Sequence, residues 1–163
     1  MEKRGKRKYE KGYEFKKLTL NTVNVQAGAL DYLGNTIDES KLTDEVESSG
    51  IYQSVARSTY LHQGFVRITN NGNGYVGMAG GTECNVICGT VKLNVYLGRS
   101  SGDGNFYSYM KWENVDYNEA SLYMSKQVKV EKGYYYRLRG YHSCTKNGVT
   151  ENGGSRTDGI YIG

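Results

Sequence analysis

The chain has 163 residues, with 22 Gly, 16 Tyr and no Pro, which is long enough for one domain with a hydrophobic core. Its net charge of +4 lies at the start: residues 1–17 carry eight Lys or Arg and three Glu, which leaves the remainder at −1. The folded part is therefore not basic enough to predict nucleic-acid binding, and no run approaches the roughly 18–20 apolar residues that span a bilayer.

Residues 1–29 form a basic leader that ends in small residues. Val25-Gln26-Ala27 followed by Gly28-Ala29 is typical of a cleavage site after a secretory signal. Polar residues between positions 19 and 24 interrupt the apolar middle that such a signal needs. We interpret the leader as an atypical signal peptide of a secreted protein. A plain disordered arm is the alternative, and whether residues 1–29 are cleaved stays open.

Residues 30–50 are acidic and show no amphipathic stripe. We interpret them as a lead-in that is flexible or becomes ordered on contact, so that the domain covers residues 51–163. The acidic residues of the lead-in are Asp31, Asp38, Glu39, Asp44, Glu45 and Glu47.

From residue 51 onward the pattern predicts eight to ten short strands separated by turns. Gly and Asn pairs predict turns at 71–74, 80–81, 100–105, 131–133 and 146–148. The predicted strands are residues 57–61, 65–70, 75–79, 84–88, 91–97, 106–115, 122–130, 134–141, 149–151 and 158–162. This spacing favours an all-β, antiparallel β-sandwich with an irregular N-terminal arm.

The stronger strands alternate between an apolar face and a polar, tyrosine-rich face, which is typical of an antiparallel sheet buried on one side. The expected inward residues are Val91, Leu93, Val95, Leu97, Phe106, Met110, Trp112, Leu122, Met124, Val128 and Val130. Their neighbours on the opposite face are mostly Tyr, Lys and Asn.

The run GYYYRLRGYH at residues 133–142 predicts the central strand. Tyr134, Tyr136, Leu138, Gly140 and His142 would face the core, and the odd-numbered residues would face water. Tyr and Arg are enriched where proteins bind partners, because they combine rigid area with hydrogen-bonding tips. The simpler interpretation is cross-strand packing that only stabilises the sheet, or coverage by residues 30–50. The predicted binding residues are Tyr96, Tyr107, Tyr109, Tyr123, Tyr135, Arg137, Arg139 and Tyr141.

The three cysteines allow at most one internal disulfide. Cys84 and Cys88 are too close in sequence to pair in an extended strand, so Cys144 would pair with one of them. Three free, buried thiols are the equal alternative. Cys-x3-Cys without a second pair is a poor zinc signal, so no metal site is predicted.

Neither catalytic residues nor a cofactor are predicted. His142 and Cys144 could share a strand face, but a nucleophile pair would need contact and a third group to orient it. A half-buried strand histidine is the simpler interpretation. A hydrolase is therefore the weakest of the functional hypotheses.

Several stretches resemble a family of small secreted proteins of unknown function from Gram-positive gut bacteria (Firmicutes). They are DESKLTDEVES, KLNVYLGRSSGDG, KGYYYRLRGYHS and TDGIYI, and the resemblance covers residues 38–162. It implies an exported, single-domain β protein without an established activity. The start departs from the family pattern, because a continuous apolar signal core is missing.

A Trp strand followed by a Tyr-x-Arg-x-Arg strand is also similar to fibronectin type III and other immunoglobulin-like sandwiches. Tyr134 or Tyr136 would then be the tyrosine that packs at a strand corner. This resemblance implies an immunoglobulin-like fold and no function.

These observations favour a non-enzymatic binding module. Its partner would be a host glycoprotein, an immunoglobulin or a glycan, docked on the Tyr/Arg face. A self-associating structural or cell-surface accessory protein is the alternative, and the oligomeric state cannot be derived from the sequence.

Overall fold

The structure, a computed structural model, describes residues 40–54 and 58–163. The predicted leader and residues 30–39 of the acidic lead-in lie outside the described residues. The strands are β1 (Leu42–Thr43), β2 (Glu47–Gln53), β3 (Leu61–Asn70), β4 (Tyr75–Ser100), β5 (Tyr107–Lys129), β6 (Tyr134–Lys146), β7 (Val149–Arg156) and β8 (Gly159–Ile162). The described part of the chain is therefore all-β, as predicted.

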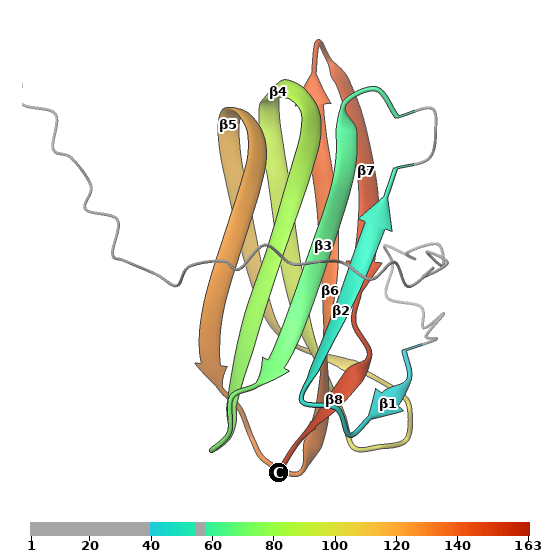
Figure 1. Cartoon of the computed structure of the whole chain (residues 1–163), viewed down its shortest axis with the longest axis vertical. Helices are drawn as coiled ribbons and strands as arrows, with labels where there is room; N and C mark the ends of the chain where they lie inside the picture. The colour runs from blue at the N-terminus through green and yellow to red at the C-terminus, as the bar shows by residue number, and fades with distance from the viewer. Residues whose placement is uncertain (1–39, 55–57) are drawn as a thin grey trace, which may run out of the picture.

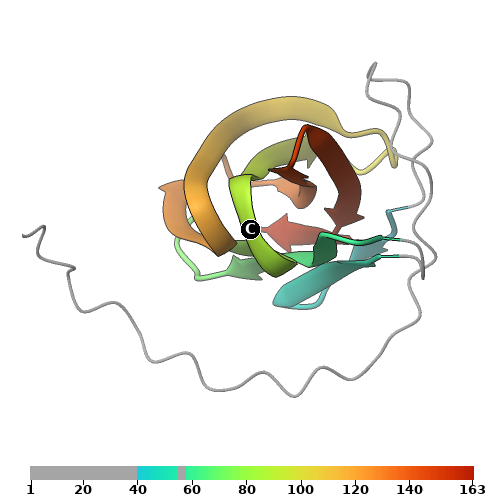
Figure 2. The same cartoon turned by 90° about the horizontal axis from the view of Figure 1, so that it is seen from above.

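All eight strands belong to one sheet with the order β1-β8-β6-β4-β3-β2, to which β5 is added along β4 and β7 along β6. Six of the seven strand pairings are antiparallel, and β1 pairs with β8 in parallel. β5 hydrogen-bonds only to β4 among the described strands, so its other side is an edge. Seen from above, the sheet is strongly curled (Figure 2).

The curl comes from one long hairpin that bends over at its middle. β4 runs from the lower end of the molecule to the upper end and returns behind, and β5 retraces this path (Figure 1). Residues 76–84 of β4 pair with β3, whereas residues 90–100 pair with β6. We call two parts of the sheet the β3 layer and the β6 layer. The β3 layer comprises β2, β3, the residues of β4 that pair with β3, and residues 121–129 of β5. The β6 layer comprises β1, β6, β7, β8, residues 88–100 of β4 and residues 107–119 of β5.

The core lies between the two layers and includes most of the residues that the alternation predicts to face inward. Leu93, Leu97, Tyr136 and Leu138 are fully buried. Met110, Trp112 and Val128 are only partly buried but pack against this core. At about 25 cal/mol per Å² of apolar surface removed from water, this one-sided burial is the main stabilising term of the fold.

Glycines let the two layers approach each other more closely than side chains would allow. A Cβ atom on Gly50 in β2 would lie 1.6 Å from the carbonyl oxygen of Arg156 in β7. A Cβ atom on Gly64 in β3 would lie 2.2 Å from the ring of His142 in β6. Since real Cβ atoms cannot come this close, glycine is required at both positions.

Two parts of the fold prediction need correction. The sheet is mixed and not antiparallel throughout, because β1 and β8 are parallel. The immunoglobulin-like sandwich is not confirmed either: it has two separate sheets, whereas here β4 and β5 pass through both layers and join them.

Local differences have identifiable causes. Gly80-Gly81 was predicted to be a turn but lies within β4, where a Cβ on Gly81 would lie 2.5 Å from Phe65 and 2.6 Å from Tyr123. Part of the acidic lead-in is folded, since it supplies β1 and the start of β2. The other predicted turns are present, with positive φ at Asn73, Gly133 and Asn147. No helix with the length and hydropathy of a membrane span occurs in residues 40–54 and 58–163.

We predict that Gly64→Ala lowers the free energy of unfolding by about 1–3 kcal/mol, because the added methyl group would overlap His142 and force the layers apart. Urea unfolding followed by tryptophan fluorescence measures this change. Gly89→Ala is the matched control: the nearest atom to its Cβ would be 3.5 Å away, and the position has no positive φ. Equal stability of the two variants would contradict the proposed close contact.

Candidate functional site

The eight residues predicted to form one binding face lie in three different places. Tyr96, Arg139 and Tyr141 share the outer face of the β6 layer, because Tyr96 is paired with Arg139 and Tyr141 is paired with Asn94 next to it. Tyr135 and Arg137 continue this face towards the lower end. Tyr107 and Tyr109 lie at the lower end of β5, and Tyr123 lies in the β3 layer. The predicted face is thus divided.

The best-defined part of this surface is a row of side chains that crosses four strands. Residues opposite each other in a sheet point to the same side. Lys111 of β5 is paired with Tyr96 of β4, Tyr96 with Arg139 of β6, and Arg139 with Arg156 of β7. We call Lys111, Tyr96, Arg139 and Arg156 the cation row. It places three positive charges and one aromatic ring side by side.

Contacts within the cation row hold the tyrosine between two cations. The Lys111 ammonium lies 5.9 Å from the centre of the Tyr96 ring, and the Arg139 guanidinium lies 6.0 Å from it. Glu113 pairs with Lys111 at 2.8 Å, and this ion pair raises the pKa of Lys111. Cation–π contacts at exposed sites contribute about 0.5–1 kcal/mol each, so they orient the ring without burying it.

Arg137 is not exposed, contrary to the sequence-based expectation for this face. Only 5% of it is accessible. Its guanidinium stacks on Phe106 at 4.3 Å and donates a hydrogen bond to Ser40 Oγ at 2.8 Å. Tyr135 beside it packs on the ring of Tyr161 at 5.2 Å. The end of the β4–β5 loop and the segment before β1 therefore cover the lower part of the face.

Tyr109 also faces inward, because the pairing of β4 with β5 shifts register between Leu97 and Gly98. Its ring meets Tyr136 edge-on at 5.6 Å. The Arg99 guanidinium lies 5.0 Å from the Tyr109 ring and 4.5 Å from the Tyr134 ring. This cluster fills the lower end of the core, while Tyr107 nearby is 68% exposed.

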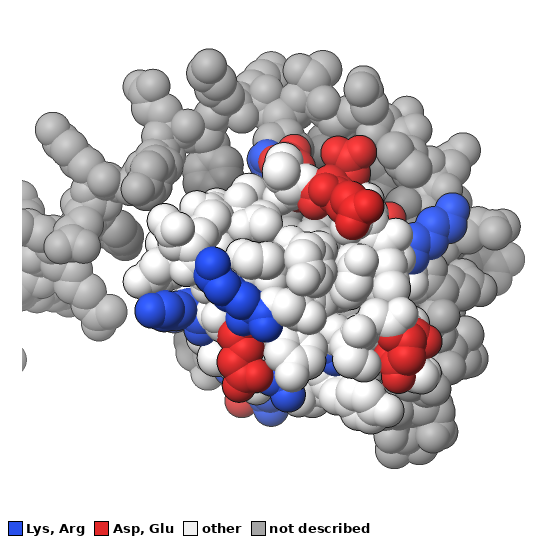
Figure 3. Space-filling model, turned by 90° about the horizontal axis from the view of Figure 1, so that it is seen from below, with Lys and Arg blue, Asp and Glu red and all other residues white. Residues whose placement is uncertain are grey.

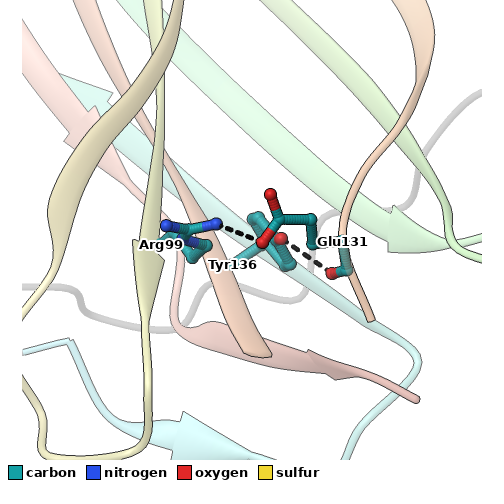
Figure 4. A network of polar contacts seen from close by, with 3 residues as sticks. All are labelled: Arg99, Glu131 and Tyr136. Atoms are coloured by element: carbon teal, nitrogen blue, oxygen red, sulfur yellow. Dashed lines mark hydrogen bonds and ion pairs between the residues drawn. The ribbon is translucent and has the colours of Figure 1, made fainter. Parts of the chain in front are cut away.

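Figure 4 shows how Glu131 closes the cluster around Arg99. Its carboxylate accepts a hydrogen bond from Arg99 at 2.7 Å, and its backbone carbonyl accepts one from the Tyr136 hydroxyl at 2.8 Å. Burial raises the pKa of Tyr136 to about 12. Arg99, Glu131 and the Tyr136 hydroxyl are all paired with one another, so we interpret this group as structural.

Tyr123 lies on the outer face of the β3 layer. Its hydroxyl donates to the Glu83 carboxylate at 2.7 Å, and its ring lies 6.3 Å from Phe65. Since it is 55% exposed and separate from the cation row, it offers an internal comparison for any binding measurement.

The lower end of the molecule does not form a patch of one charge. Lysines, arginines and carboxylates are scattered there over a largely uncharged surface (Figure 3). Arg67 pairs with Glu47, and Arg99 pairs with Glu131. The geometry therefore favours the cation row over this end as a binding surface.

His142 is fully buried between the layers in a chain of hydrogen bonds. Its Nδ1 lies 2.9 Å from Thr82 Oγ1, which donates its own hydrogen to the Lys92 carbonyl at 3.0 Å. Thr82 must then accept from Nδ1–H, and His142 Nε2 accepts from Ser155 Oγ at 2.7 Å. Burial lowers the pKa of His142 to about 3, against the opposing effect of a backbone hydrogen bond with Gly81.

This Ser–His–Thr chain has the connectivity of a nucleophile and its base, but both ends are closed to solvent. Ser155 is 4% and Thr82 0% accessible, and the Cβ of an alanine at Gly140 would collide with both Ser155 and His142. We therefore interpret the chain as a structural link between the layers. The histidine was predicted to be half buried, and its hydrogen-bond partners could not be derived from sequence spacing.

The cysteines come together at the upper end as three free thiols. Nearby, the Glu151 carboxylate accepts hydrogen bonds from the Ser58 hydroxyl and from the backbone N–H groups of Thr59, Tyr60 and Leu61, at 2.6–2.9 Å. These bonds lower the pKa of Glu151 to about 2, although its partial desolvation opposes them. Glu151 thus fixes the start of β3 against β7.

Sequence reasoning missed most of the partners in these arrangements. Lys111 and Arg156 join the cation row only through strand register, although Lys111 belonged to the polar face of its strand. Arg99 and Glu131 lie 32 positions apart and meet at the lower end. The signal that could have identified these partners is the register in which the predicted strands pair.

The sequence matches the profile of a known protein family. The profile of a family of unknown function (DUF6147) matches residues 31–159. No curated protein matches the sequence.

We predict that stability falls as the pH is lowered from 7.5 to 5.5, by about 1.4 kcal/mol from His142 alone. Above pH 6.5 the histidine is neutral in both the folded and the unfolded protein, so its protonation does not lower the free energy of unfolding. Below that value the unfolded chain gains a proton that the folded protein does not accept until about pH 3. Unfolding free energies across this range measure the fall, and His142→Gln should flatten it.

Nitrogen NMR of the folded protein provides the independent measurement. His142 should keep the signals of a neutral, Nδ1-protonated ring at pH 5.5. A titration midpoint near 6.5 for this ring would contradict the assignment.

Proposed function

The chain belongs to this family of unknown function, and we propose that it is a non-enzymatic binding module whose ligand docks on the outer face of the β6 layer. The observation that supports this most is the cation row, with Tyr96 held between Lys111 and Arg139. The ligand class is a glycoprotein, an immunoglobulin or a glycan. Three cations in one row favour a ligand that carries carboxylate or sulfate groups.

The proposal has a simple physical basis. A half-exposed tyrosine ring offers flat apolar area for a sugar or side chain, and arginine donates paired hydrogen bonds to an anionic group. Because contacts between neighbouring strands already orient Tyr96, binding would cost little additional side-chain entropy. The ordered sheet beneath it provides a rigid support.

We further propose that the protein acts outside the cell, as an exported protein of a Gram-positive gut bacterium (Firmicutes). The basic leader with its small residues at 25–29 and the resemblance of residues 38–162 support this. Nucleic acid is not a proposed partner, since the excess of basic residues lies within residues 1–17.

Self-association is the second candidate, supported by exposed apolar side chains at the upper end. Ile87 is 63%, Tyr117 66% and Val115 42% accessible. Tyr117 is paired with Thr90, two residues beyond Cys88, so these side chains lie near the same bend of the β4–β5 hairpin. Such a group is a candidate contact between copies of the chain.

We predict that replacing Arg139 and Tyr96 by Ser lowers affinity for the ligand at least 10-fold, since centrally placed Arg and Tyr dominate binding energy at interfaces. The measurement is binding of the labelled protein to an array of neutral glycans, acidic glycans and serum proteins. Titration against the strongest hit then gives the dissociation constants.

Tyr123→Ser is the matched control, because it removes an exposed tyrosine from the other layer. It should leave the affinity unchanged. The proposal is wrong if the wild type binds no member of the array, or if the Arg139 and Tyr96 variants bind as well as the control.

For self-association we predict a concentration-dependent mass in sedimentation experiments, which Ile87→Ser together with Tyr117→Ser should abolish. Val46→Ser serves as the comparison, because Val46 is 65% exposed and contacts β3 at its other end through Asn70. A wild-type protein that stays monomeric at high concentration would rule out this candidate.

A further inference from the structure

The three cysteine sulfur atoms of the chain form one tight cluster. The Sγ atoms of Cys84, Cys88 and Cys144 all lie within 4.8 Å of one another. The chain contains three cysteines in total, so all of its thiols converge at one point. Cys88 and Cys144 are buried, with 0% and 1% accessible, and Cys84 is half buried.

The cluster exists because of the bend in β4. Cys84 begins, and Cys88 directly follows, an irregular stretch of β4 where the pairing with β5 skips from Glu83 to Cys88. The backbone between them turns outward, so that residues 85–87 are exposed. In a regular extended strand the two residues would be about 13 Å apart. Cys144 comes from β6, where its neighbour across the sheet is Val91.

The spacing of the sulfur atoms fits a single metal ion. A Zn²⁺ ion with Zn–S bonds of about 2.3 Å and tetrahedral angles needs sulfur atoms about 3.8 Å apart. The cluster therefore has to contract by about 1 Å at most to close around zinc. A disulfide would need two of the sulfur atoms to approach to about 2.05 Å, and it would leave the third thiol alone.

A cation that binds to the cluster has to replace the protons of the thiols. Burial and mutual proximity raise the pKa of Cys84 and Cys144, which favours protonated thiols at these two positions as long as no cation is bound. A bound cation would displace these protons and offset the charge of the thiolates. The Lys146 ammonium donates to the Ile87 carbonyl at 2.7 Å, directly beside the cluster, and supplies a further positive charge.

We propose that Cys84, Cys88 and Cys144 form a Zn²⁺ site with three thiolate ligands and one open position. No other His, Cys, Asp or Glu of the described residues belongs to the cluster. The fourth position would hold a water molecule or an external ligand, which could enter on the half-buried Cys84 side. Three protein ligands and one exchangeable ligand are the pattern of zinc sites that stay reactive.

Zinc is favoured over Cu⁺ by charge. Three thiolates with Zn²⁺ carry a net charge of −1, which one lysine can balance, whereas Cu⁺ would leave −2 in a largely buried site. The nearby Glu151 is negative and contributes to the raised pKa of Cys84, which makes a second excess negative charge more costly. The ion would join β4 at its bend to β6 and so tie the long hairpin to the centre of the sheet.

The test uses the full chain, purified with a phosphine reductant and freed of metal with a chelator. Zn²⁺ is titrated in competition with a chromophoric chelator, and Co²⁺ serves as a spectroscopic probe for thiolate coordination. We expect one ion per chain, an intense sulfur-to-cobalt charge-transfer band and a higher melting temperature with zinc. Cys88→Ser and Cys144→Ser should each weaken zinc binding at least 100-fold and reduce the band.

His62→Ala is the control, because His62 is an exposed histidine outside the cluster, and it should bind zinc like the wild type. If a cysteine variant fails to fold, alkylation of the wild type replaces it: zinc should slow the alkylation of the half-buried Cys84 in the folded protein.

Three results would overturn the proposal. They are the absence of a charge-transfer band with unchanged thiol reactivity, a disulfide detected as a mass two hydrogens lower under reducing conditions, and binding of Cu⁺ without binding of Zn²⁺.

Discussion

The close approach of the β3 layer to the β6 layer is the constraint on which the rest of this structure depends. Gly50 and Gly64 leave room for the backbone of β7 and for the ring of His142, and Gly140 leaves room beside that ring. The neutral ring of the buried histidine then forms hydrogen bonds with the hydroxyl groups of both Thr82 and Ser155. A side chain at any of these glycines would disturb packing and hydrogen bonding together.

This contact also determines where functional groups can lie. With the interior filled by aliphatic side chains, tyrosine rings and the histidine chain, the polar chemistry is confined to the outer faces and the two ends. The outer face of the β6 layer carries the cation row, the upper end carries the thiols, and the lower end carries paired charges. These three regions are distinct enough that variants in one should leave the others intact.

Much of the fold could be predicted because one-sided burial leaves a period-two pattern. Leu93, Leu97, Leu138 and His142 face inward as the alternation indicates. The errors arise where long-range contacts override local signals. Gly80-Gly81 is typical of a turn, but here it lies within a strand and leaves room for the aromatic rings packed against Gly81. The parallel pairing of Leu42 with Gly159 joins residues that lie far apart in the sequence.

The candidate sites were less predictable, because they depend on register and on the bend of β4. Alternation correctly grouped Tyr96 with Arg139, but it could not show that Phe106 and Ser40 cover Arg137. It also could not show that a register shift turns Tyr109 inward. The thiol cluster was beyond reach, since an extended Cys-x3-Cys keeps its sulfur atoms apart and only the bend brings them together.

The open side of β5 has a consequence for the addition of strands from other copies of the chain. Among the described strands, β5 with its 23 residues pairs only with β4, so its other side exposes backbone groups that could recruit a strand from another molecule. Ionic side chains interrupt this border along its length, so that stacking identical copies would bring like charges into register. They are Lys111, Glu113, Asp116, Glu119, Lys126 and Lys129. Strand addition along β5 is thereby discouraged, which favours contacts between copies through side-chain surfaces instead.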